Sequence, residues 1–223
     1  MKTIIFDFDG TLTKQNQNIW KLLWSELGYK TDKTSLYSKL YVEHVIKKTI
    51  TREQWFNLTA LAFKKNGMSI ETLNHVSSKI ELIDGAKDFV KSLFNAGFSL
   101  HIVSGCITQT IENVLGDLTK YFTHIESNTA VFDESGKLKK FIATPFDYAG
   151  KAEYVKNLMI KTNSNASEVV FVGNGDNDEW VHLAGCKTIC INADNTNSNN
   201  KTIWNEKIDN LKSLDELSNV FNF

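Results

Sequence analysis

The sequence is poor in arginine and cysteine. Among its 25 basic residues only Arg52 is an arginine, and the rest are lysines. Bidentate binding of an anion by arginine is therefore limited to this one residue. Any phosphate chemistry would depend on lysine, backbone N–H groups or a metal ion. The three cysteines, Cys106, Cys186 and Cys190, form neither a disulfide framework nor a zinc-binding set. They are typical of buried residues in a protein from a reducing compartment.

The chain also lacks an excess of one charge and long apolar runs. Its 25 basic and 26 acidic residues give a net charge of −1, which excludes the basic footprint of a nucleic-acid or anionic-membrane binder. No apolar run approaches the roughly 18 residues of a membrane span, and Asp7 follows the start too closely for a signal peptide. With 42% hydrophobic and 23% charged residues, disordered and coiled-coil proteins are excluded. We expect a soluble cytoplasmic protein.

The length of 223 residues exceeds that of a bare five-stranded α/β unit but is short for two full domains. Residues 14–82 show helical periodicity and no apolar strand. Outside this segment, short apolar strands alternate with helices, which predicts a parallel α/β sheet. We therefore expect a core made of residues 1–13 and 83–223 and a helical insert over 14–82.

Local signals predict where several elements begin and end. Thr51 with Gln54 is a capping-box pattern, and Ser69 is an N-cap candidate. Asp84 is expected to cap the first helix after the insert, and Asp178 a later one. The apolar residues 98–105 predict a strand that ends in a turn at its Ser-Gly pair. The pattern over 130–142 predicts a β-hairpin, separate from a weak strand near 122–125.

Polar residues follow three of the predicted strands. Asp7 and Asp9 follow the first, Ser104 and Gly105 end the second, and residues 174–178 follow a third. Open parallel sheets bind ligands at the carboxyl ends of their strands. We therefore expect these segments to meet in one crevice.

The spacing of Asp7 and Asp9 indicates a divalent cation site. Residues two apart in an extended chain point to the same side, and two neighbouring carboxylates repel unless a cation or proton lies between them. Mg²⁺ suits such oxygen ligands where phosphate is also bound. One carboxylate could attack a phosphoryl group, and the second could protonate the leaving oxygen and then activate water.

Three further residues are candidates for binding the phosphoryl group. Ser104 supplies a hydroxyl, and the N–H of Gly105 can approach closely because glycine has no side chain. Lys151 lies at a predicted helix start and could reach the phosphate with its ammonium. A lysine in this role agrees with the near-absence of arginine.

Four segments in order resemble the motifs of one family. They read DFDGTL at 7–12, IVSG at 102–105, GKAEYV at 150–155 and VGNGDND at 172–178. Together they resemble the haloacid dehalogenase-like (HAD) superfamily of phosphatases over residues 1 to about 190. The segment ELIDGA at 81–86 looks like the phosphoserine-phosphatase branch.

The resemblance implies a Rossmann-like three-layer sandwich with a parallel central sheet and a small helical cap formed by the insert. It implies Mg²⁺-dependent hydrolysis of a small phosphate monoester through an aspartyl-phosphate on Asp7. Asp9 would be the general acid/base, with its backbone carbonyl on the metal. Ser104 and Lys151 would hold the phosphoryl group.

The fourth motif departs from the family pattern. Asn174 stands where the family usually has an aspartate that completes the metal shell, and an amide oxygen can bind Mg²⁺ but adds no charge. The expected metal set is Asp7, Asp9, Asn174 and Asp178, with Asp176 as the rival of Asp178.

These departures from the family pattern leave alternative substrates and functions open. Residues 14–18 contain no acid and Arg52 does not match the branch's cap arginine, which together argue against phosphoserine as the substrate. A phosphotransferase on the same scaffold is an alternative, as is a degenerate, non-catalytic domain that binds phosphorylated ligands; a dehalogenase is disfavoured because Asp9 would have no role. Arg52 itself is expected to be a solvated helix residue.

The insert is rich in aromatic residues at helical spacing. Such residues usually pack in a core, and one or two are expected to line the pocket and to favour an apolar or aromatic leaving group. The candidates are Trp20, Trp24, Trp55, Phe56 and Phe63.

Overall fold

The computed structural model describes residues 2–193 and 203–221. Its centre is a seven-stranded sheet in the order β4-β3-β2-β1-β5-β6-β7. Every neighbouring pair is parallel except β3 and β4, as the alternating strands and helices predicted. The strands are β1 (Thr3–Phe6), β2 (Ser99–Ile107), β3 (Phe122–Phe132), β4 (Leu138–Ile142), β5 (Val169–Gly173), β6 (Lys187–Ile191) and β7 (Glu206–Ile208).

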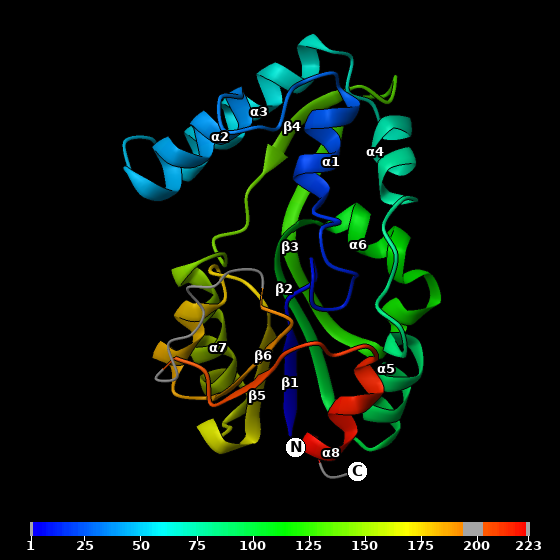
Figure 1. Ribbon diagram of the computed structural model, residues 1–223, viewed down its shortest axis with the longest axis vertical. Helices are drawn as coiled ribbons and strands as arrows, with labels where there is room; N and C mark the ends of the chain where they lie inside the picture. The colour runs from blue at the N-terminus through cyan, green and yellow to red at the C-terminus, as the bar shows by residue number, and fades with distance from the viewer. Residues whose placement is uncertain (1, 194–202, 222–223) are drawn as a thin grey trace.

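Helices cover both faces of the sheet and make a three-layer sandwich (Figure 1). One face carries α5 (Ala86–Asn95), α6 (Thr108–Leu115) and α8 (Ser218–Phe221), and the other carries α7 (Ala149–Thr162). Short 3₁₀ helices complete the layers: η2 (Gly116–Tyr121), η3 (Ala166–Glu168), η4 (Glu179–Ala184) and η6 (Leu214–Leu217). The expected Rossmann-like α/β fold is confirmed.

The alternation of side chains along β1 determines where Asp7 points. Phe6 packs edge-on against Phe89 of α5, with ring centroids 6.5 Å apart. Ile5 belongs instead to the cluster on the opposite face, with Val155 of α7. Because successive side chains of a strand alternate, Asp7 lies on the same side as Ile5, toward α7.

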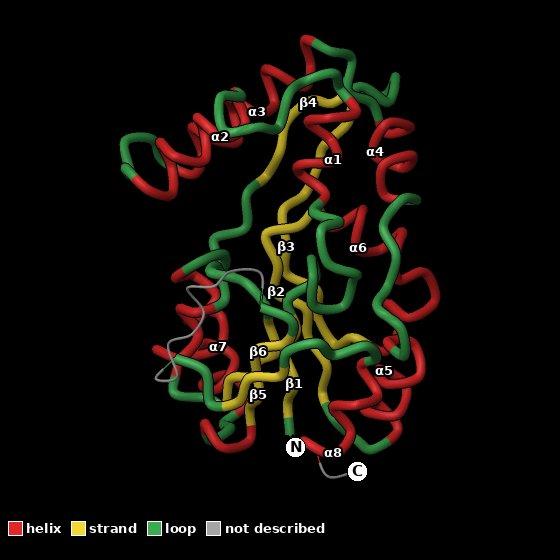
Figure 2. Tube along the Cα trace, in the orientation of Figure 1, coloured by secondary structure: helices red, strands yellow, loops and turns green. Residues whose placement is uncertain are grey.

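The insert forms a group of helices beyond the carboxyl ends of the strands (Figures 1 and 2). They are α1 (Ile19–Glu26), α2 (Leu36–Tyr41), the π-helical turn η1 (Val42–Ile46), α3 (Arg52–Lys65) and α4 (Ile70–Ser77). The capping box of Thr51 and Gln54 is present at α3, and Ser69 accepts from the N–H of Thr72 at α4. Both predicted caps are confirmed.

The two connections between the insert and the sheet run side by side. The N–H of Lys14 donates to the carbonyl of Glu81 over 2.9 Å, and Thr13 forms an antiparallel bridge with Leu82. The Lys14 ammonium also lies 2.6 Å from the Glu81 carboxylate. We keep the division into a core and a cap over 14–82 as a proposal, which these paired connections support.

Asp84 does not cap the helix that follows it. Helix α5 begins at Ala86, and its N-cap is Gly85 with φ 75°, so no side chain accepts from the first turn. A Cβ at this glycine would lie 2.1 Å from the Ser213 hydroxyl oxygen. The C-terminal segment therefore packs where a capping side chain was expected, and the Asp84 prediction was wrong.

The second strand does not end at Ser104 and Gly105. It continues to Ile107, with an irregular register against β3 between Val103 and Ile107. The side chain of Asn128 on β3 donates to the carbonyl of Gly105 over 2.6 Å and to that of Cys106 over 3.1 Å. These contacts hold the segment along β3, whereas local sequence alone predicted a turn.

The hairpin of β3 and β4 reaches the insert. Its first strand is one continuous element from Phe122, so the separately predicted strand near 122–125 is part of β3. The N–H of Leu138 donates to the carbonyl of Met68, and the ring of Phe141 packs edge-on against Trp20 at 5.2 Å. A part of the chain that the sequence assigned to the core thus contacts the insert.

All three cysteines lie within the described residues. They are buried and unpaired, as expected. No helix within residues 2–193 and 203–221 has the length and apolarity to cross a membrane.

Candidate active site

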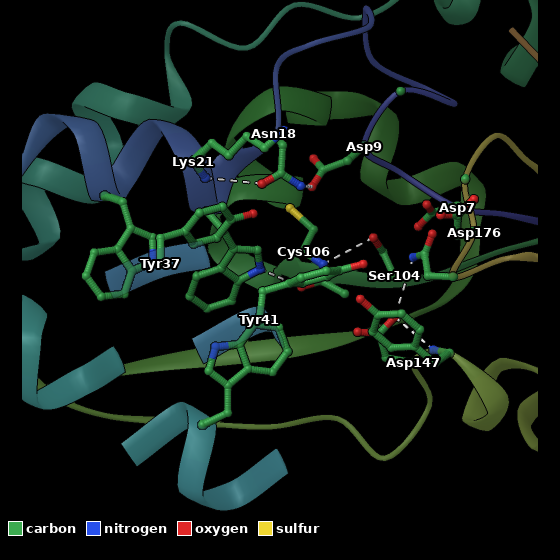
Figure 3. A pocket seen from close by; sticks show the side chains of 18 of the residues that line it. Asp7, Asp9, Asn18, Lys21, Tyr37, Tyr41, Ser104, Cys106, Asp147 and Asp176 are labelled. Carbon is green, nitrogen blue, oxygen red and sulfur yellow. Dashed lines mark hydrogen bonds between the residues drawn. The ribbon is translucent and has the colours of Figure 1, made fainter. Parts of the chain in front are cut away.

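A cavity of about 460 Å³ lies between the strand ends and the insert. Figure 3 shows the aspartates Asp7 and Asp176 at one side of it and the aromatic residues Tyr37 and Tyr41 at the other. Its core lining is Asp7, Asp9, Gly10, Ser104, Gly105, Cys106, Asp147, Tyr148, Asn174, Gly175, Asp176 and Asn177. The insert contributes Asn16, Gln17, Asn18, Trp20, Lys21, Trp24, Tyr37, Ser38, Tyr41, Arg52, Trp55, Phe56 and Thr59.

Lys151 lies between two buried carboxylates. Its Nζ is 3.0 Å from Oδ1 of Asp7 and 2.5 Å from Oδ1 of Asp178. The side chains of Lys151 and Asp178 are fully buried, and only 4% of the Asp7 side chain is exposed. Helix α7 thus supplies the positive charge that the sequence placed beside the phosphoryl group.

The surroundings shift the pKa values of this group. Burial and then the charge of Asp178 raise the pKa of Asp7 to about 6, although Lys151 and the Ser104 hydroxyl oppose the shift. Asp7 is therefore mainly ionised at neutral pH and can act as a nucleophile. Burial lowers the pKa of Lys151, but the carboxylates of Asp178, Asp7 and Asp147 outweigh it and raise that pKa above its ordinary value.

Asp178 organises the loop after β5 and does not cap the helix that follows. Its Oδ2 accepts from the backbone N–H of Asn174 at 2.9 Å and of Gly175 at 3.0 Å, while Oδ1 accepts from Lys151. No side-chain cap bond reaches η4, so the predicted capping role was wrong. A Cβ at Gly173 would lie 2.5 Å from the Asp178 carboxyl carbon, which explains a glycine there.

Ser104 and Gly105 border the same cavity as Asp7. Ser104 is 1% exposed, and its hydroxyl accepts from the N–H of Cys106 over 3.2 Å. Gly105 accepts the indole N–H of Trp20 at its carbonyl over 2.8 Å. A Cβ at Gly105 would lie 2.7 Å from an Asp147 oxygen. The glycine is thus needed for the close approach of its neighbours.

Asp9 is positioned by the start of the insert. The amide of Asn18 donates to Oδ2 of Asp9 over 3.2 Å. The same side chain accepts from the N–H of Lys21 and caps α1. Asn18 therefore joins the first helix of the insert to the predicted acid/base, a contact that the sequence did not reveal.

Asn174 lies against the first motif. Its Oδ1 accepts from the Thr11 hydroxyl over 3.2 Å, and its buried Nδ2 has no hydrogen-bond partner. A Cβ at Gly10 would lie 2.3 Å from that nitrogen, so only glycine fits there. A half-turn of the amide would leave Thr11 hydrogen-bonded and place an oxygen at the unpartnered position.

These residues can form a site for a hard cation if carboxylate, carbonyl and amide oxygens all serve as ligands. Within the described residues, no group of three or more His, Cys, Asp or Glu side chains forms a metal site, so carboxylates alone do not suffice. The Asp7 carboxylate, the Asp9 carbonyl and a turned Asn174 amide would supply the oxygen ligands that Mg²⁺ prefers. Asp178 is engaged by Lys151 and two N–H groups, and its metal role stays a prediction, as does the rival role of Asp176.

Arg52 is a site residue that the sequence reading placed in solvent, and that expectation was wrong. Its Nη2 donates to Oδ1 of Asn128 over 3.2 Å and to Oδ2 of Asp147 over 3.1 Å. The Arg52 side chain is 20% exposed and that of Asp147 8%. The guanidinium also lies 5.4 Å from the ring centroid of Phe56. The first residue of α3 thus spans from the insert to the core.

The aromatic residues of the insert divide into packing and lining groups. Phe63 is fully buried and does not line the cavity, whereas four of the five named candidates do. Those four are Trp20, Trp24, Trp55 and Phe56. Tyr37, Tyr41 and Tyr148 also line it and were not predicted; the helical spacing of the two insert tyrosines was the available signal.

Comparison with known proteins agrees with this geometry. The family model of haloacid dehalogenase-like hydrolases matches residues 4–179. The chain belongs to this family. The motif resemblance found in the sequence is thereby confirmed.

Curated relatives of this HAD-family chain include phosphoserine phosphatases. The one from Archaeoglobus fulgidus is 28% identical over 195 residues, which are 86% of this chain and 53% of the relative. A probable phosphoserine phosphatase from Schizosaccharomyces pombe is 24% identical over 79% of this chain and 56% of its own length. The chain spans about half the length of these two relatives.

Solved structures show the same fold. A phosphoserine phosphatase with an analogue of its phospho-aspartyl intermediate has a TM-score of 0.75 at 22% identity, over 98% of both chains. The magnesium-bound HAD hydrolase YfnB from Bacillus subtilis has a TM-score of 0.63 at 20% identity, over 100% of this chain and 99% of that one. This likeness supports the phosphoserine-phosphatase-like HAD fold.

Proposed function

We propose that the chain is a Mg²⁺-dependent phosphomonoesterase that works through an aspartyl-phosphate on Asp7. The observation that carries the proposal is the buried Lys151 ammonium 3.0 Å from the Asp7 carboxylate, at the end of β1 and beside an open cavity. An ionised carboxylate beside a buried cation suits attack on a phosphoryl group. The names of the curated relatives support phosphate ester chemistry.

In the first step the Asp7 carboxylate attacks phosphorus and the bond from phosphorus to the ester oxygen breaks. Asp9 donates its proton to that leaving oxygen, which departs as an alcohol. Lys151 and the Ser104 hydroxyl hold the transferred oxygens and offset their charge. The product of this step is an acyl phosphate on Asp7.

In the second step water attacks the phosphorus of the acyl phosphate. Asp9, now a carboxylate, takes a proton from this water, and the bond between phosphorus and the Asp7 oxygen breaks. Inorganic phosphate leaves, Asp7 is again a carboxylate, and Asp9 is again protonated. Asp178 holds Lys151 in place throughout.

Asp7, the Asp9 carbonyl and Asn174 would hold Mg²⁺ in this proposal, with Asp178 or Asp176 as the further candidate. The ion, when bound, neutralises phosphate charge and allows the anionic nucleophile to approach the anionic substrate. Substrates would be small phosphate monoesters. A cytoplasmic location also belongs to the proposal, supported by three buried, unpaired thiols.

Asn174 favours a second candidate function, a non-catalytic domain that binds phosphorylated ligands. An amide ligand lacks the charge of the usual aspartate. Such a domain would retain the phosphate-binding contacts of Ser104 and Lys151 without turnover. A phosphotransferase on the same residues would differ only in using an alcohol instead of water in the second step.

Hydrolysis of para-nitrophenyl phosphate separates these functions. We expect turnover with Mg²⁺, its loss with a chelator, and a decrease of at least about a thousandfold in kcat for Asp7→Asn. Release of inorganic phosphate in the presence of added alcohols distinguishes hydrolysis from transfer. Wild-type turnover no greater than that of Asp7→Asn would contradict the phosphatase proposal and favour the binding domain.

A further inference from the structure

The cavity continues from the phosphoryl centre into a surface made of aromatic rings. Tyr37, Tyr41 and Trp55 of the insert line it and are only partly buried. Trp24 also lines the cavity, and its ring centroid is 6.2 Å from that of Tyr37. In Figure 3 the two labelled tyrosines lie on the side away from Asp7. We call the three lining residues Tyr37, Tyr41 and Trp55 the ring wall.

The ring wall is not the packed interior of the insert. That interior is formed around Phe63, whose ring lies 4.9 Å from Trp24 and 5.9 Å from Phe141. Phe63 is fully buried and Phe141 is 6% exposed, and neither lines the cavity. The insert therefore has a complete aromatic core and, in addition, rings that keep exposed surface toward the cavity.

The charges around the cavity are distributed unevenly. The four carboxylates among the described lining residues all belong to loops that follow strands: Asp7, Asp9, Asp147 and Asp176. The insert adds the cations Lys21 and Arg52 to the lining and no carboxylate. An ammonium group on the substrate would thus find its carboxylate partners on the core side of the cavity.

A carboxylate on the substrate would lack a dedicated partner. Arg52 is already bonded to Asp147 at 3.1 Å and to Asn128 at 3.2 Å. Lys21 is an exposed residue at the rim. Burying a charge without a close partner is costly. An uncharged leaving group therefore suits this half of the cavity best.

We propose that the ring wall selects phosphate monoesters whose leaving alcohol is uncharged and carries an apolar ring. Rings pack on aromatic side chains in offset or edge-on geometry at 4.5–7 Å between centroids. A volume of about 460 Å³ lies in the range of small-molecule sites, so it exceeds the needs of the phosphoryl group alone. This inference rests on the proposed phosphatase function and names the substrate class of the same site.

Three primary-alcohol esters with different leaving groups test the proposal. Phenethyl phosphate carries a neutral ring, phosphoethanolamine a strongly hydrated primary ammonium, and O-phosphoserine an amino acid. We expect kcat/KM for phenethyl phosphate to exceed that of each of the other two at least tenfold, since burying a ring contributes roughly a factor of ten or more. Equal values, or preference for a charged ester, would overturn the ring-wall proposal while leaving the phosphatase function intact.

A matched set of variants locates the selectivity. Trp55→Leu and Tyr41→Leu should each raise KM for phenethyl phosphate about tenfold and thereby reduce its advantage in kcat/KM over O-phosphoserine. Phe94→Leu, an exposed position on α5 (47% exposed), should change neither. The ring wall does not select the leaving group if both variants retain the full preference for phenethyl phosphate. The same conclusion follows if the variants lower kcat/KM for all three esters equally.

Binding keeps the two proposals separable. If none of the esters is hydrolysed, the phosphatase proposal is wrong. Calorimetry on the wild-type chain then tests the ring-wall proposal by itself. Tighter binding of phenethyl phosphate than of O-phosphoserine by about tenfold would support it. Equal binding, or no binding of phenethyl phosphate, would overturn it.

Discussion

At the scale of single residues, the buried group of Lys151, Asp7 and Asp178 dominates the site. One ammonium faces two carboxylates at 3.0 and 2.5 Å, and all three side chains are removed from water. The group holds two negative charges and one positive charge, and two backbone N–H groups also donate to Asp178. Removing one partner from a buried ion pair costs several kcal/mol. The same arrangement presents Asp7 to the cavity as an anion.

Replacing Asp178 by asparagine should therefore affect both stability and activity. Asp178→Asn removes the closer partner of Lys151, and we expect the free energy of unfolding to fall by about 3 kcal/mol, with kcat reduced at least tenfold. Urea denaturation and steady-state kinetics measure the two effects. Asp88→Asn, an aspartate on α5 with an 83% exposed side chain, should stay within about 0.5 kcal/mol of wild type. Equal stability of the two variants would contradict this account of the group.

Asn174 makes a second residue-scale prediction. If its amide oxygen is a ligand, Asn174→Asp adds a charge at that position and should tighten Mg²⁺ binding by about tenfold. The contact with the Thr11 hydroxyl, 3.2 Å in the native chain, is available to an aspartate as well. Calorimetric titration with Mg²⁺ in the absence of substrate measures the change. An unaltered affinity, together with loss of binding in Asp176→Asn, would assign the ligand role to Asp176.

At the scale of elements, periodicity and caps predicted a large part of the fold. The alternation of strands with helices predicted the parallel sheet. The polar residues that follow β1 and β5 and those within the last residues of β2 line one cavity, as expected. The caps at Thr51 and Ser69 are local signals and were read correctly. Each of these features depends on a short stretch of sequence, so it can be predicted without knowledge of tertiary contacts.

The features that were missed depend on tertiary contacts. β2 continues past Gly105 because Asn128 holds its carbonyl, and Asp178 does not cap a helix because Lys151 and two N–H groups occupy its carboxylate. Arg52 points into the site because Asp147 and Asn128 accept hydrogen bonds from its Nη2 group. Helical spacing gives the face of a residue but not the partner that faces it.

A buried histidine joins β2 to α7 at a distance from the site and predicts a pH dependence. His101 Nδ1 lies 2.9 Å from the Tyr154 hydroxyl. Burial, followed by the charges of His124 and Lys161, lowers the pKa of His101 to about 4. Because the unfolded chain binds this proton near pH 6.5, the contribution of neutral His101 to stability is complete above that pH. It is lost as the pH falls toward 4.

We expect His101→Gln to remove this dependence. Between pH 7 and 4 the wild type should lose about 3 kcal/mol more unfolding free energy than the variant. Urea denaturation at several pH values measures the difference. A constant gap between the two proteins over this range would contradict the assigned pKa.

At the scale of the whole molecule, the surplus length of the chain corresponds to the proposed cap over 14–82, whose helices lie beyond the strand ends (Figure 1). Insert side chains are tied to core residues of the cavity at several points, among them Asn18 to Asp9, Trp20 to the carbonyl of Gly105, and Arg52 to Asp147 and Asn128. The covering position allows the insert to exclude water and to select the leaving group. The single arginine of the chain thus serves the assembly of the site.

Weakening the arginine tie should loosen the cavity without unfolding the chain. In Arg52→Lys the charge remains, but the Nη2 group that donates to both Asp147 and Asn128 is lost. We expect amide hydrogen exchange over residues 144–151 to become about tenfold faster, which corresponds to about 1.4 kcal/mol of local opening free energy. Lys64→Met, an exposed change on the same helix, is the control. Unchanged exchange in Arg52→Lys would show that this tie does not hold the loop.

The central claim is that Asp7 carries the phosphoryl group during turnover. Acid quenching of the wild-type chain during hydrolysis of para-nitrophenyl phosphate with Mg²⁺, followed by peptide mass spectrometry, tests it directly. The account predicts one phosphoryl group on the peptide that contains Asp7, removable by hydroxylamine and absent from Asp7→Asn. Steady turnover with the phosphoryl group on another residue, or undiminished turnover in Asp7→Asn, would contradict it.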